Sequence, residues 1–193
     1  MKKTGWIILG VIVVLVLWVF SGYNGMVGEQ EKATTELSNM QAQYQRRADM
    51  MPQLAKIVKA YAKHEKETFE EVTKARASVG QVKLDVNNLT EASMKQYAAA
   101  QGELANAFSK LMLVAERYPE LKASENFKSL QIQEEGTENR ISEARRKYNE
   151  AVQSYNVKVR RMPNAIIAGL FGFDTMPKFE AAAGSEKAPD LDI

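Results

Sequence analysis

Few side chains in this sequence could bind a metal or take part in catalysis. The first candidates are His64 and Glu65. A metal site built on one helix needs two ligands about one turn apart, but His64 is the only histidine. The chain has no cysteine, which excludes thiolate metal sites, disulfides and cysteine catalysis. A solvated pair therefore explains His64-Glu65 better than a metal or catalytic site does.

A run of carboxylates follows the histidine, at Glu65, Glu67, Glu70 and Glu71. Paired carboxylates carry out acid–base chemistry only where burial separates their pKa values. Lysines are interspersed with these residues, and that mixture is typical of a solvated helix face. The sequence also contains no phosphate-binding glycine loop or nucleophile motif. We therefore expect no enzyme, no catalytic centre, no metal and no cofactor.

Basic residues form two clusters, Arg145-Arg146-Lys147 and Arg160-Arg161. Lys and Arg total 26 and Asp and Glu total 24, so the formal net charge is only +2. This balance does not call for a polyanionic partner, and we expect no nucleic acid. The first cluster predicts ion pairs along a helical bundle, and the second could also face anionic lipid.

A Tyr-Asn pair occurs twice, at Tyr148-Asn149 and at Tyr155-Asn156. Seven residues are close to two helical turns, so both rings lie on one helix face with both amides beside them. A buried tyrosine must satisfy its hydroxyl, and the adjacent asparagine is a natural partner. The repeat predicts either a polar layer that fixes helix register or a face that recognises a peptide or ligand.

The elements that position these residues begin with an uncharged N-terminal stretch. No charged residue occurs from Thr4 to Gly28, and a membrane-spanning helix needs about 20 predominantly apolar residues. We therefore predict a transmembrane anchor within residues 1–28, with a cleaved signal peptide as the alternative. The residues assigned to the anchor, which include aromatic rings at both borders, are Trp6, Ile7, Leu15, Trp18, Phe20 and Tyr23.

Charge predicts the orientation of this anchor. Lys2 and Lys3 precede it and the acidic Glu29 follows it, and basic residues stay on the cytoplasmic side of a membrane. We expect a single-pass protein with its N-terminus in the cytoplasm and the domain formed by residues 29–180 outside it.

Helix-favouring residues and apolar positions at steps of three and four predict that residues 29–180 form an all-α domain. Four long helices are expected, at about residues 29–47, 52–78, 90–118 and 124–162. Short connections favour antiparallel neighbours, so an elongated up-and-down bundle follows. Polar Glu134 and Thr137 interrupt the apolar seam of the last helix. The small, polar residues 181–193 are expected to form a disordered tail.

The up-and-down order returns the end of the fourth helix to the membrane. The apolar stretch that follows it is too short to span a bilayer. It predicts a cap on the bundle core, or else contact with lipid, with another membrane protein or with a neighbouring copy. The candidate membrane-proximal and self-association residues are Arg160, Arg161, Ile166, Ile167, Leu170, Phe171 and Phe173.

Several motifs give the chain a resemblance to a known family over residues 6–179. They are Tyr23-Asn24, Gln45-Arg46-Arg47-Ala48-Asp49-Met50-Met51-Pro52-Gln53-Leu54, His64-Glu65, Thr73-Lys74-Ala75-Arg76, Tyr118-Pro119-Glu120-Leu121-Lys122-Ala123, Glu125-Asn126-Phe127, Leu130, Glu138-Asn139-Arg140-Ile141, Ala144-Arg145-Arg146-Lys147-Tyr148-Asn149, Val152, Tyr155-Asn156, Pro163, Phe171-Gly172-Phe173 and Phe179. In order and spacing the chain resembles the LemA family of bacterial membrane-anchored helical proteins. It departs from the family pattern at Ala48, at Met50-Met51 and at Met162, where bulkier or differently branched residues are usual.

The resemblance implies one anchor in the bacterial inner membrane, an extracytoplasmic helical bundle and no known catalytic centre. We expect a structural, self-assembling scaffold of the cell envelope that forms homo-oligomers through coiled-coil-like helix faces. Members of the family often occur near envelope-stress and membrane-protease systems. The alternative function is therefore a recognition or adaptor module for such a protease or sensing system.

Overall fold

The computed structural model describes residues 2–85 and 88–180, and the predicted tail at 181–193 lies outside them. Within the described residues the chain is all-helical, as the sequence predicts. The helices are α1 (Lys2–Tyr61), α2 (Lys66–Gln81), α3 (Glu91–Glu116), α4 (Pro119–Ala123), α5 (Glu125–Arg160) and α6 (Asn164–Phe171). Four of them are long, and α4 and α6 are short additions that the sequence pattern did not predict as helices.

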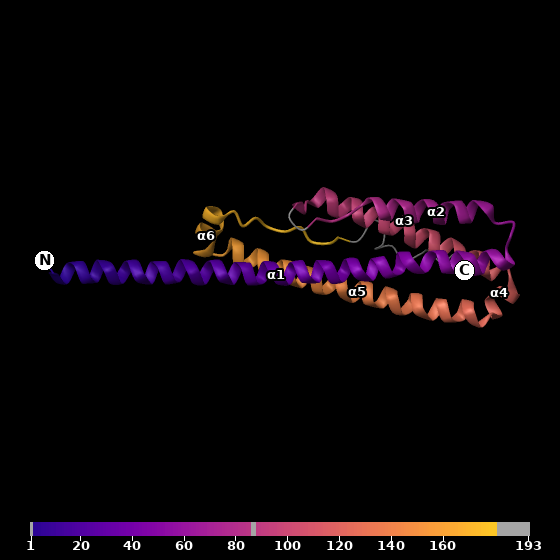
Figure 1. Ribbon diagram of the computed structural model, residues 1–193, viewed down its shortest axis with the longest axis horizontal. Helices are drawn as coiled ribbons and strands as arrows, with labels where there is room; N and C mark the ends of the chain where they lie inside the picture. The colour runs from indigo at the N-terminus through magenta and orange to yellow at the C-terminus, as the bar shows by residue number, and fades with distance from the viewer. Residues whose placement is uncertain (1, 86–87, 181–193) are drawn as a thin grey trace, which may run out of the picture.

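One rod dominates the shape of the molecule. Figure 1 shows α1 projecting alone at its N-terminal end, with α2 and α3 on one side of its C-terminal half and α5 on the other. At the helical rise of 1.5 Å per residue, the 60 residues of α1 span about 90 Å. The chain runs outward along α1, back along α2, outward along α3 and back along α5, which is the predicted up-and-down order.

The predicted break near Asp49–Pro52 is wrong, because α1 continues through Pro52 to Tyr61. The apolar stripe of α1 keeps its register across the proline, with Met51 and Leu54 buried and the Pro52 ring exposed. Packing of that stripe outweighs the one backbone donor that proline lacks. Residues 62–65 separate α1 from α2, so the predicted second helix, at about residues 52–78, is divided between the end of α1 and α2.

Local capping fixes the starts of α3 and α5. The Thr90 side chain accepts a hydrogen bond from Ser93 N at 3.1 Å, and Ser93 Oγ accepts one from Thr90 N at 3.0 Å. The Ser124 side chain caps α5 by accepting from Phe127 N at 3.3 Å. These caps satisfy backbone donors that the helices leave unpaired, and they confirm the predicted start of the third helix.

Buried side chains form three apolar clusters along the bundle. The distal cluster joins α1, α2, α3 and α5 around Leu104 and Leu111, and the middle cluster surrounds Tyr44 and Tyr148. The membrane-proximal cluster consists of Met26, Tyr155, Val159, Ile167 and Ala168. Among the described residues this last level is built by α1, α5, α6 and the segment after α6, since α2 and α3 do not reach it.

Candidate functional site

The first third of α1 carries apolar side chains that the rest of the protein leaves uncovered. Trp6 is 75% exposed and Phe20 63% exposed. By length and composition this stretch is the one helix in the described part of the chain able to cross a membrane. Such a surface is unfavourable in water and suited to lipid. Among the predicted anchor residues, Ile7 and Leu15 are exposed like Trp6, whereas Trp18 also packs on the membrane-proximal cluster.

Helix α6 packs against α1 where this uncovered stretch ends. Tyr23 of α1 lies edge-on to Phe171 and to Phe173, with ring centroids 5.1 and 5.4 Å apart. Gly22 permits the approach, because a Cβ atom there would come within 2.6 Å of Ile167 Cδ1. The apolar stretch predicted to return to the membrane end of the bundle therefore lies beside the outer end of the predicted span.

The two faces of α6 have different surroundings. Ile167 and Ala168 are buried in the membrane-proximal cluster, whereas Leu170 is 76% exposed and Ile166 and Phe171 are each 53% exposed. Together α6 and α1 border an open apolar groove of about 500 Å³, lined by Leu15, Val16, Val19, Phe20, Tyr23 and Phe171. One face thus caps the core, and the other leaves an apolar surface continuous with that of the span. We call this exposed face of α6 (Ile166, Leu170 and Phe171) the foot.

Two arginines precede the foot in the chain. Arg160 and Arg161 are exposed at the turn between α5 and α6, and the Arg160 Nε atom donates to Asn156 O at 3.3 Å. The end of α5 lies beside the C-terminal border of the predicted span, since Lys158 Nζ would be 2.7 Å from a Cβ atom at Gly25.

The repeated Tyr-Asn pair of α5 binds the backbone of residues 173–180. Asn149 Nδ2 donates to Phe179 O at 2.9 Å, and Asn149 Oδ1 accepts from Phe179 N at 2.8 Å. Asn156 makes the same two bonds, each of 2.8 Å, with Met176 O and Met176 N. Each asparagine therefore closes a two-bond ring on one residue of the segment, a geometry that fixes both position and direction.

The two tyrosines extend this pattern. Tyr148 Oη donates to Pro177 O at 2.7 Å, and Tyr155 Oη donates to Asp174 O at 2.8 Å. Burial raises the pKa of Tyr148, and burial together with the negative charge of Asp174 raises the pKa of Tyr155. Both hydroxyls therefore stay protonated and act as donors. The hydroxyls do not bond the neighbouring asparagines, so that part of the sequence interpretation is wrong.

Apolar side chains fix the other side of this segment. Phe179 is buried, with its ring 6.0 Å from the Tyr44 ring and with the Arg145 guanidinium 5.8 Å from its centroid. Met176 is half-buried between the middle and membrane-proximal clusters. The segment thus covers α1 and α5 between α6 and the start of α3, and its end shares the middle cluster with Met94 and Tyr97 of α3.

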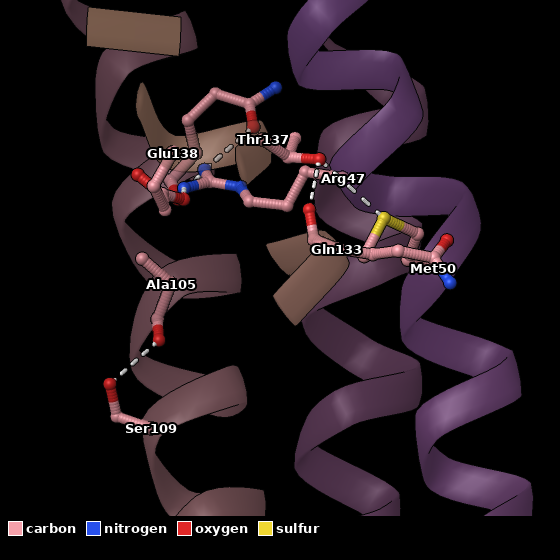
Figure 2. A network of polar contacts seen from close by, with 8 residues as sticks. Arg47, Met50, Ala105, Ser109, Gln133, Thr137 and Glu138 are labelled. Carbon is pink, nitrogen blue, oxygen red and sulfur yellow. Dashed lines mark hydrogen bonds and ion pairs between the residues drawn. The ribbon is translucent and has the colours of Figure 1, made fainter. Parts of the chain in front are cut away.

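A buried polar layer separates the middle cluster from the distal one. Arg47 is 4% exposed, and its Nη2 donates to Gln101 O at 2.8 Å and to Gln101 Oε1 at 3.1 Å. Its Nη1 forms an ion pair with Glu138 Oε1 at 2.6 Å. Figure 2 shows Arg47 extending from α1 toward Glu138, so one guanidinium connects three helices.

This layer contains a second carboxyl, that of Glu134. Glu134 is 4% exposed, and its Oε2 atom has no hydrogen-bond partner within the described protein. Burial, followed by the charge of Glu138, raises the pKa of Glu134 to about 7, and the charge of Arg47 opposes the change. Thr137, the other polar residue that interrupts the seam, is satisfied locally by donating to Gln133 O at 2.8 Å and lies 3.7 Å from Met50 Sδ.

The other chemical candidates in the sequence lie on the surface. His64 is exposed in the turn after α1, and Glu65 pairs with Arg117 at 2.8 Å. Glu71 pairs with Lys110 at 2.6 Å. No group of three His, Cys, Asp or Glu side chains in the described part of the chain is arranged to hold a metal ion.

The first basic cluster forms ion pairs along α5. Arg146 contacts Glu143 at 2.7 Å and also Glu150, and Lys147 lies 3.7 Å from Glu143. These exposed pairs lie one turn apart on a single helix, where solvent screens the attraction between the charges. They account for Arg146 and Lys147 without any external ligand.

Sequence reasoning missed Arg47 and the role of residues 174–180. The sequence places Arg47 between Tyr44 and Met51 on the apolar stripe of α1, but which residues lie opposite it is known only from the helix packing. The segment gave no signal, because its bonds come from backbone atoms that every sequence has.

Comparison with known proteins agrees with this architecture. The family model of the LemA family matches residues 36–192. The chain is 26% identical to the magnetosome protein MamQ of Magnetospirillum gryphiswaldense, covering 90% of this chain and 70% of the relative. It is 24% identical to the magnetosome proteins MamQ 1 and MamQ 2 of Paramagnetospirillum magneticum, covering 88% of this chain and 68% of each relative. The family assignment and the uncovered apolar helix indicate a membrane-anchored helical protein. The chain belongs to the LemA family.

Proposed function

We propose that this protein is a non-enzymatic scaffold of the bacterial cell envelope that assembles side by side with copies of itself. The observation that supports the proposal is the continuity of α1, which runs from the uncovered apolar stretch into the bundle core as one helix. A continuous helix transmits the orientation of the span to the bundle, so the domain stands at a fixed angle to the bilayer. That property suits a structural element better than a tethered enzyme.

In this proposal the protein crosses the inner membrane once, with its N-terminus in the cytoplasm and its bundle outside. Lys2 and Lys3 precede the span, which supports this orientation through the preference of basic residues for the cytoplasmic side. The foot then rests at the outer interface, with Arg160 and Arg161 at the depth of the lipid phosphates. The MamQ relatives are magnetosome proteins by name, which supports a part in a cellular structure.

Self-association would use the foot. Leu170 and Phe171 continue the apolar surface of the span, and a neighbouring copy held in the same membrane presents the same surface at the same depth. Copies that pack there remove apolar side chains from the headgroup region, where they are poorly accommodated. Lateral contact of identical surfaces between anchored copies is then the simplest assembly.

Single-cysteine crosslinking in membranes tests this proposal, because the chain has no cysteine of its own. Leu170→Cys should give dimers with a short bis-maleimide reagent. Ile132→Cys is the matched control, since Ile132 is also apolar and 69% exposed but lies toward the opposite end of α5. Equal yields from the two variants, or none from either, would contradict assembly through the foot.

A second candidate function is an extracytoplasmic recognition or adaptor module for a membrane protease or envelope-stress sensor. The specific observation in its favour is the Tyr-Asn repeat, whose side chains bind an extended backbone. Crosslinking from this face in intact membranes should then capture a different protein, and self-crosslinks without any other product would count against it.

A further inference from the structure

The contacts between the Tyr-Asn repeat and residues 173–180 go to backbone atoms. Tyr148, Asn149, Tyr155 and Asn156 make six hydrogen bonds to the segment, and each partner atom is a main-chain nitrogen or oxygen. Backbone atoms are common to all sequences. This face of α5 is therefore built to bind an extended chain as such, in the way that a sheet edge does.

The spacing of the two pairs matches an extended chain. Seven residues of α5 advance about 10.5 Å, and three residues of an extended or polyproline-type chain advance about 9–10 Å. Asn156 holds Met176 and Asn149 holds Phe179, three residues further on, so the segment runs antiparallel to α5. The tyrosines keep the same step, from Asp174 to Pro177. Two identical units thus bind successive three-residue repeats.

Selectivity on this face of α5 would come from apolar side chains of the bound chain at the same three-residue step. Phe173 and Met176 are half-buried and Phe179 is buried, whereas Lys178 is exposed and meets Gln153 Oε1 at 3.4 Å. This face of α5 therefore suits an extended peptide with an apolar residue at every third position. The segment of this chain supplies that pattern.

We propose that the Tyr-Asn face of α5 in one copy binds residues 173–180 of a neighbouring copy, so that assembled copies exchange these segments. The segment follows Gly172, whose φ of 73° is the left-handed conformation that glycine adopts readily and turns the chain out of α6. Exchange would require Phe173 to leave its ring contact with Tyr23 of the same chain. Anchored copies present the segment and the Tyr-Asn face of α5 at the same height above the bilayer. Exchange then replaces each contact within a chain by the identical contact between chains.

This inference rests on the proposed function in one respect, since it requires copies to stand side by side. Its test uses two differently tagged full-length chains, one carrying Gln153→Cys and the other Lys178→Cys, co-expressed and treated in membranes with a short bis-maleimide. Neither chain can crosslink within itself, so a product that carries both tags reports a segment seated on another copy. Glu135→Cys paired with Lys178→Cys is the control, because Glu135 is exposed on α5 but about 27 Å along the helix from Gln153.

We expect a two-tag product from the Gln153→Cys and Lys178→Cys chains in clear excess over the control pair. If the double variant in a single chain crosslinks internally, while the mixed chains do not and Leu170→Cys still dimerises, exchange is overturned and the scaffold stands. If neither the mixed chains nor Leu170→Cys crosslink, exchange and self-assembly are both overturned. An equal yield from the control pair would mean random collision and would also overturn the exchange.

Discussion

Asn149 and Phe179 lie 30 residues apart in the chain, yet one side-chain amide of Asn149 pairs with both backbone groups of Phe179, at 2.9 and 2.8 Å. Together with the same arrangement at Asn156 and Met176, this pairing holds the backbone of the segment on the bundle. The segment has no strand or helix of its own among the described residues, so its order depends on side chains of α5.

Removing both amides should release the segment. In the double variant Asn149→Leu and Asn156→Leu, the amide protons of Met176 and Phe179 lose their acceptors, so their hydrogen exchange should accelerate by about tenfold or more. Hydrogen-exchange mass spectrometry of the full-length protein in detergent measures this. Asn139→Leu, at an exposed position of α5, is the control and should leave the exchange of these protons unchanged. Unaltered protection in the double variant would mean that the apolar side chains alone hold the segment.

Arg47 should contribute to the free energy of unfolding, whereas its neighbour Arg46 should not. Arg47→Ala removes the ion pair with Glu138 and leaves Gln101 O without its partner, which should cost about 2–4 kcal/mol because the site is buried. Arg46 is exposed, so Arg46→Ala should change stability by less than about 0.5 kcal/mol. Thermal unfolding followed by circular dichroism in detergent compares the two, and similar melting temperatures would refute the role of the buried layer.

The sequence predicts one part of the buried polar layer and not the other. The interruption at Glu134 and Thr137 was visible, because polar residues stood where the apolar seam of the fourth helix required apolar ones. The partner was not visible, since helix pairing decides which residue of α1 lies opposite. Arg47 can be assigned only once α1, α3 and α5 are placed side by side.

Glu134 should make stability depend on pH. Its folded pKa of about 7 lies above its ordinary value of 4.5, so the folded protein binds more protons than the unfolded chain between pH 4.5 and 7. The free energy of unfolding should therefore fall as the pH rises through this window, by up to about 3 kcal/mol. Glu134→Gln should remove this decline, as seen in melting temperatures recorded from pH 4.5 to 8. The exposed Glu135→Gln should keep the wild-type profile. A decline that persists in Glu134→Gln would assign the pH dependence to another group.

Gly22 should determine whether α6 can pack. A larger side chain there meets Ile167 and Asn164, whereas a Cβ atom at Gly28 would meet nothing within 4 Å. Gly22→Leu should therefore displace α6 and expose the buried Ala168, while Gly28→Leu should not. An Ala168→Cys background reports this as the rate of maleimide labelling in membranes. Equal rates in the two leucine variants would show that α6 does not depend on the close approach at Gly22.

The general architecture followed from the sequence because it depends on patterns that are local. An uncharged apolar run, apolar stripes at steps of three and four and the cap at Thr90 each act within a few residues. Pro52 misled the prediction because proline is usually disfavoured inside a helix, and burial of Met51 and Leu54 outweighed that preference. The contacts of Tyr148 and Tyr155 could not be predicted, because their partners are backbone carbonyls of a segment that forms neither a helix nor a strand.

In the proposed function, copies of this protein stand side by side in a membrane. Electron cryomicroscopy of the full-length protein, after extraction into discs of its own lipid, would show this arrangement. We expect particles that contain several bundles, each upright on the disc, with the foot at the headgroup level and adjacent to its neighbour. Particles that hold a single bundle at every protein concentration would contradict it.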